Sequence, residues 1–73
     1  MTTVTHVKKR RAVFDVLPEF RTGFLIWCNT MPPSANPTSD KNFAQKLTEH
    51  IRANKVGADV LAPLIESGAI EVA

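Results

Sequence analysis

Two apolar runs in the first half of the chain show the alternation that is typical of β-strands. In residues 11–17, Ala12, Phe14 and Val16 fall on one face of an extended chain, and the other four positions fall on the opposite face. Residues 24–29 are rich in branched and aromatic side chains and are apolar on both faces. We expect the first strand to be half-buried and the second to be central in a sheet or covered by a helix.

Residues 18–23 are expected to connect these two strands. Pro18 has no N–H to donate to a β-ladder, and Gly23 tolerates positive φ, so both favour a turn longer than a tight hairpin turn. Phe20 falls in this connection, where a large aromatic side chain is a candidate for contact with a partner. The first half of the chain therefore predicts a β-hairpin.

The pattern changes to a helical one after a proline-rich loop. Residues 31–39 contain three prolines, which remove backbone donors and disfavour helix. Beyond them, Phe43, Leu47 and Ile51 recur every four residues, as on one face of an amphipathic helix. This spacing predicts a helix from about residue 40 to residue 54.

A second helix and a strand are predicted at the end of the chain. Gly57 is placed to end the first helix, residues 58–67 predict a shorter second helix, and Gly68 is placed to stop it. Residues 69–72 alternate as a final strand would, and residues 1–7 form a β-prone tail that either pairs with an edge strand or stays loose. The predicted fold is α+β, in the order ββααβ, with a three-stranded sheet and both helices on one face.

Length and composition indicate one small domain over residues 1–73. The chain is 44% hydrophobic and 22% charged, which is ordinary for a globular protein. A single cysteine, Cys28, excludes an internal disulfide, and its apolar surroundings favour a buried packing thiol. The longest apolar run is too short to span a membrane, so we expect a soluble intracellular protein.

Charge is distributed unevenly along the chain, although its net value is only +2. Four bases are adjacent near the start, whereas Asp59, Glu66 and Glu71 near the end have no base among them. This asymmetry favours an acidic partner for the N-terminal part, either phosphates or a carboxylate-rich protein surface. A solvated strand end that discourages edge pairing is the alternative interpretation. The four bases are Lys8, Lys9, Arg10 and Arg11.

Phe20, Arg21 and Trp27 are further candidates for a partner-binding surface beside these bases. An aromatic ring can accept a stacked base or a cation, and a loop-borne Phe20 is the better contact candidate of the two aromatics. For Trp27, packing against a helix or the sheet is the favoured interpretation.

No residue pattern in the chain supports catalysis, a metal or a cofactor. The spacing of cysteine and histidine does not match a zinc site, and the three isolated glycines do not form a phosphate-binding loop. A thiol mechanism with Cys28, His50 and Asp59 would place its nucleophile in an apolar run, where the thiolate is disfavoured. The two predicted helices resemble a helix-turn-helix only in outline, because the second has no Arg, Lys, Asn or Gln to contact base edges. We therefore expect a binding module that is not an enzyme.

The length of 73 residues, the basic start MTTVTHVKKRRAVF and the lack of catalytic motifs resemble one group of proteins. These are small lytic-phage proteins that bind the host RNA polymerase, of the Xanthomonas-phage inhibitor and antiterminator type. The resemblance implies binding to the N-terminal region of the β′ subunit near the RNA exit channel, interference with σ at initiation, and antitermination. It also implies a place in the host bacterial cytoplasm.

Two other functions share the same sequence features. A small nucleic-acid-binding protein would use the basic residues directly on phosphates, and its binding would weaken steeply with salt. A phage inhibitor of another host complex differs from the polymerase regulator only in the identity of its partner. In each case we expect a monomer.

Overall fold

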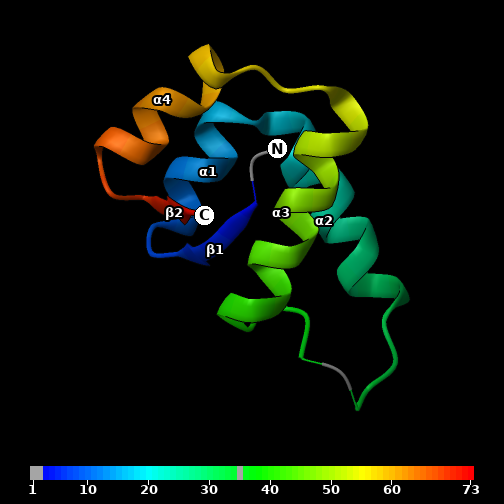
Figure 1. Ribbon diagram of the computed structural model, residues 1–73. Coiled ribbons are helices and arrows are strands. Elements are labelled where there is room, and N and C mark those ends of the chain that lie inside the picture. The colour runs from blue at the N-terminus through cyan, green and yellow to red at the C-terminus, as the bar shows by residue number, and fades with distance from the viewer. Residues whose placement is uncertain (1–2, 35) are drawn as a thin grey trace.

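The computed structural model describes residues 3–34 and 36–73, which form four helices and one small antiparallel sheet (Figure 1). The α+β class predicted from the sequence agrees with this arrangement, but the order of elements and the number of strands do not. In chain order the elements are β1 (Val4–Val7), α1 (Arg10–Val16), α2 (Pro18–Thr30), α3 (Asp40–Asn54), α4 (Ala58–Glu66) and β2 (Ile70–Val72).

The sheet pairs the two ends of the chain. Val4 lies opposite Val72 and Val7 lies opposite Ile70, and the register is irregular between Val4 and His6. Of the two possibilities left open for the N-terminal tail, the strand is the one observed for residues 4–7. The predicted three-stranded sheet is wrong, because the part of the chain that the structure describes has two paired strands.

The predicted β-hairpin is also wrong, because residues 10–16 and 18–30 form helices α1 and α2. Val13, Leu17, Phe20 and Phe24 follow the i, i+4, i+7, i+11 spacing of a helical stripe, and all four are buried. Helix formation buries this stripe in one core, whereas two strands would have placed its members on different faces. Pro18 starts α2 rather than a β-turn.

The boundary between α1 and α2 is a sharp bend at one residue. Leu17 has φ −123° and ψ 74°, outside the helical region, as expected for a residue that precedes proline. The Leu17 N–H still donates to the Val13 carbonyl at 2.8 Å, and the Arg21 N–H donates to the Leu17 carbonyl at 3.3 Å. The bend therefore changes the direction of the chain while leaving both helix ends hydrogen-bonded.

The helix predicted from about residue 40 to residue 54 is confirmed as α3 (Asp40–Asn54). Ser39 caps it, since its side chain accepts a hydrogen bond from the Asn42 N–H at 3.2 Å. Its end differs from the prediction: Lys55, with φ 51°, takes the left-handed position that we expected of Gly57. Gly57 instead lies at the start of α4.

The second helix and the last strand are confirmed as α4 and β2. Gly68 has φ 75°, which suits glycine, and it ends α4 as predicted. The Ala69 N–H then donates to the Leu64 carbonyl at 2.9 Å, and the chain continues directly into β2.

A cluster of four phenylalanine rings joins α1, α2 and α3. Phe14, Phe20, Phe24 and Phe43 lie with ring centroids between 4.7 and 5.9 Å apart. The rings meet in tilted and edge-to-face arrangements, which aromatic pairs prefer over parallel stacking. This cluster holds the bend between α1 and α2 against α3, and so it fixes the surface described next.

Candidate binding surface at the bend between α1 and α2

The four adjacent bases do not form one free strip. Lys8 makes an ion pair with Glu71, with 2.7 Å between Nζ and Oε1, and the Lys9 Nζ donates to the Ser67 carbonyl at 3.4 Å. The hydrogen bond from Lys8 and its positive charge lower the pKa of the Glu71 carboxyl. Two of the four predicted contact residues therefore have partners within their own chain.

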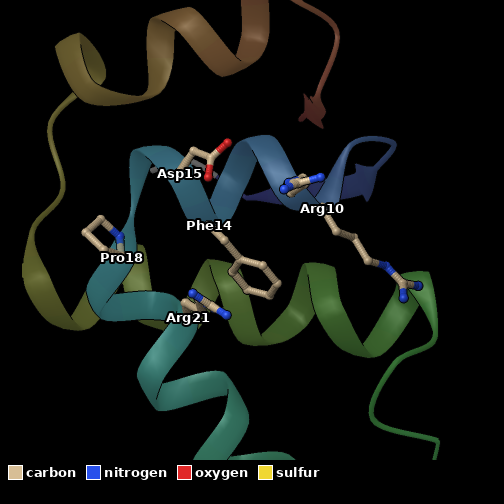
Figure 2. Close-up of a pocket in the computed structure, with 6 residues that line it drawn as sticks. Arg10, Phe14, Asp15, Pro18 and Arg21 are labelled. Carbon is tan, nitrogen blue, oxygen red and sulfur yellow. The ribbon is translucent and has the colours of Figure 1, made fainter.

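Arg10 also has a partner, an acidic residue of α3. Its Nη2 lies 2.9 Å from Oδ1 of Asp40, in the first turn of α3. Its guanidinium carbon lies 5.4 Å from the centroid of the Phe43 ring. Figure 2 shows Arg10 extended toward the start of α3. Arg10 therefore links α1 to α3 and is not free to pair with a ligand.

Arg11 and Arg21 are the two bases of the predicted site whose side chains make neither an ion pair nor a hydrogen bond within residues 3–34 and 36–73. Both are exposed, and they come from different helices, α1 and α2. They line one open cavity of about 620 Å³ at the bend, shown in Figure 2. We call this surface the basic elbow; it consists of Arg11, Phe14, Asp15, Pro18 and Arg21, with Arg10 at its edge.

The floor of the basic elbow is apolar. The ring of Phe14 points toward α3 and belongs to the phenylalanine cluster, and Pro18 fixes the bend (Figure 2). Asp15 adds one exposed carboxylate. With Arg10 neutralised by Asp40, the elbow presents two free positive charges and one negative charge, which suits a carboxylate-bearing ligand with an apolar part.

The two aromatic residues predicted for the site lie elsewhere. Phe20 is 1% exposed, so its assignment to an exposed loop is wrong: it lies on the buried face of α2 and packs in the core. Trp27 is half-buried, 5.5 Å from the Phe24 ring, and the Lys46 ammonium lies 5.6 Å from the Trp27 ring centroid. The packing interpretation of Trp27 agrees with this position.

Leu25 and Ile26 are exposed apolar residues beside the basic elbow that the sequence prediction did not name as contacts. They are 50% and 60% exposed, and they lie in the second half of α2. Arg21 and Leu25 are four residues apart in one helix, so they are neighbours on its surface. The signal was present in the sequence as the apolar character of residues 24–29 on both faces, which we interpreted as a central strand.

The surface has the features of a binding site and none that identify a reaction. Across the described residues, no group of three or more His, Cys, Asp or Glu side chains could hold a metal ion. Within the same residues, no helix is long and apolar enough to cross a membrane. Comparison with family models, curated proteins and solved structures finds no match to this chain.

Proposed function

We propose that this chain is a small regulator that binds bacterial RNA polymerase and uses the basic elbow to contact an acidic surface of the enzyme. The observation that carries the proposal is the meeting of Arg11 and Arg21 in one cavity without carboxylate partners among the described residues. The resemblance of the chain to small phage transcription regulators directs the proposal to polymerase. The N-terminal region of β′ near the RNA exit channel is the proposed docking site.

The physical properties of the surface suit this role. Complementary charge accelerates encounter with a large partner, and desolvated apolar side chains supply most of the affinity. We expect a chain of this size to regulate transcription by occupying a junction of the polymerase that must either move or bind σ. We therefore propose that it interferes with σ at initiation and promotes antitermination, with no chemical step of its own.

Direct binding to nucleic acid is the competing proposal, and the charges argue against it. Two free arginines would give a salt dependence with a slope near −2, which is about a tenfold loss between 50 and 200 mM salt. Proteins that rely on phosphate contacts use several more of them.

The test is co-elution of the protein with purified bacterial core polymerase and holoenzyme, followed by transcription in vitro from templates with a promoter and a terminator. We expect a stoichiometric complex, reduced initiation and increased readthrough. The double variant Arg11→Glu, Arg21→Glu should abolish these effects. The control is Arg52→Glu, which changes an exposed arginine near the end of α3 and should preserve them. Failure to bind polymerase, or unchanged initiation and termination, would refute the proposal.

The arginine-to-glutamate variants also distinguish binding to polymerase from binding to nucleic acid. If bare DNA or RNA is shifted at low salt, and the arginine variants lose this shift while polymerase binding persists, the nucleic-acid interpretation is correct. If neither DNA nor RNA is shifted at low salt, that interpretation is excluded.

A further inference from the structure

Helix α2 carries two large exposed apolar residues, Leu25 and Ile26, on the side that faces away from the core. Its buried side carries Phe20 and Phe24, which join the phenylalanine cluster. Its other side follows the i, i+3, i+4, i+7, i+8, i+11 spacing of a second helical stripe. We call this stripe the outward face of α2; its residues are Pro18, Arg21, Thr22, Leu25, Ile26 and Asn29, and all are exposed.

The outward face begins in the basic elbow. Pro18 and Arg21 line the cavity at the bend, and Leu25 and Ile26 follow one turn further along the same helix. In Figure 1, α2 runs away from the bend beside α3, toward the loop at residues 31–39. Charged and apolar side chains therefore form one continuous surface rather than two separate patches.

Exposed apolar residues are common when they are single, so exposure alone does not define a site. Here two large side chains are adjacent, at least half exposed, and one turn from an arginine with no ion pair among the described residues. Polar residues at these positions would favour solubility at no cost to the core. Their apolar character is explained if a partner covers them.

We propose that the outward face of α2 binds an acidic amphipathic helix of the partner, with carboxylates over the arginines and apolar side chains over Leu25 and Ile26. The charges favour this occupant, because Arg11 and Arg21 outnumber the single carboxylate of Asp15 at one end of the face and the other end has no charge. Ile26 is five positions after Arg21 in the helix, a rise of about 7.5 Å. A partner helix with carboxylates one to two turns away from its apolar residues matches this spacing.

This inference rests on the proposed function for the identity of the partner, and two measurements separate the two proposals. The first is binding of purified polymerase to the Leu25→Ser, Ile26→Ser variant, which we expect to be weaker by about tenfold or more. The matched control is Val60→Ser, Ile65→Ser, which removes two exposed apolar residues of α4 and should bind like the wild type. Because all four positions are exposed, circular dichroism should show that both variants fold.

The second measurement uses a synthetic helical peptide with two glutamates one turn before two leucines, and a matched peptide with lysines in place of the glutamates. Titration of the ¹⁵N-labelled protein should shift the amides of Arg21, Leu25 and Ile26 with the acidic peptide and leave them unchanged with the basic one. Equal response to both peptides, or shifts confined to another element, would overturn the inference even if polymerase binds.

The outcomes are distinguishable. If polymerase binds the Leu25→Ser, Ile26→Ser variant as tightly as the wild type, the inferred docking face is wrong and the proposed function stands. If polymerase does not bind the wild type but the acidic peptide binds the outward face of α2, the proposed function is wrong and the docking face stands. Self-association that the Leu25→Ser, Ile26→Ser change abolishes would show a second copy as the occupant and refute the acidic partner.

Discussion

The hydroxyl of Thr48 accepts a hydrogen bond from the backbone N–H of Val4, at 2.9 Å, across 44 residues of sequence. The same hydroxyl donates to the Ala44 carbonyl, also at 2.9 Å. Thr48 is buried in α3, and Val4 lies in β1. The Thr48 side chain therefore provides an acceptor for a buried backbone N–H of β1, a role that a third strand would have in a larger sheet. This contact ties β1 to α3.

Replacing Thr48 with valine should destabilise the protein by about 1–3 kcal/mol, because valine keeps the shape but leaves the buried Val4 N–H without an acceptor. Urea denaturation gives the free energy of unfolding, and amide exchange at Val4 should become faster. Thr48→Ser is the control, since it keeps the hydroxyl and should preserve protection at Val4. Unchanged stability and exchange in Thr48→Val would show that this hydrogen bond contributes nothing.

Substitutions at two adjacent residues of α2 should separate effects on stability from effects on binding. Phe20→Ala should cost about 3–5 kcal/mol, because it removes a ring that is 1% exposed from the phenylalanine cluster. Arg21→Ala should change stability by no more than about 0.5 kcal/mol, since Arg21 is exposed and has no ion pair among the described residues, but it should weaken polymerase binding. Thermal unfolding and co-elution with polymerase measure the two effects. A stable Phe20→Ala variant that fails to bind would restore Phe20 as a contact residue.

The sequence predicted α3 correctly but not α2, and the difference lies in where the apolar residues fall. In α3, Phe43, Leu47 and Ile51 are buried on one face, so the helical period stands out. In α2, exposed Leu25 and Ile26 add apolar residues to the opposite face and hide that period. Local inconsistency of this kind is expected where a surface serves a function. The residues that misled the prediction are those that we now assign to docking.

The candidate surface was only partly predictable, because it depends on long-range contacts. Arg11 and Arg21 were both named from the sequence, yet only the bend at Pro18 brings them into one cavity. The four-base cluster looked uniform in sequence. Its division follows from Glu71 and Asp40, which lie 63 and 30 positions away from Lys8 and Arg10 (71 − 8 and 40 − 10), and no local pattern indicates such pairings.

The imidazole of His50, in α3, packs against Phe20 of α2. Its ring centroid lies 5.3 Å from that of Phe20. Burial lowers the pKa of His50, the Glu19 carboxylate opposes this effect, and the Lys46 ammonium adds a smaller lowering. Because the folded state favours the neutral ring, the unfolded chain binds more protons below the ordinary value near 6.5. This contribution to stability is therefore complete above that pH and is lost as the pH falls.

His50→Gln should reduce the loss of stability between pH 7.5 and 5.5, because glutamine does not titrate in this range. Unfolding temperature measured across the range in wild type and variant checks this expectation. His6→Gln, at the other histidine of the chain, is the control. An identical pH dependence in His50→Gln and the wild type would show that His50 does not link protonation to folding.

Substitution of Gly23 tests whether this part of the chain forms helix α2 or a hairpin turn. It lies in the interior of α2, its φ is not positive, and a Cβ built on it meets no atom within 4 Å. Gly23→Ala should therefore stabilise the protein by about 0.5–1 kcal/mol, because alanine favours helix and restricts the unfolded chain. Gly68→Ala is the matched control, and it should be destabilising, since φ is 75° there. In a hairpin turn that required positive φ at Gly23, alanine would be destabilising at both positions. Opposite signs in the two unfolding free energies would therefore establish α2, and equal signs would favour the turn.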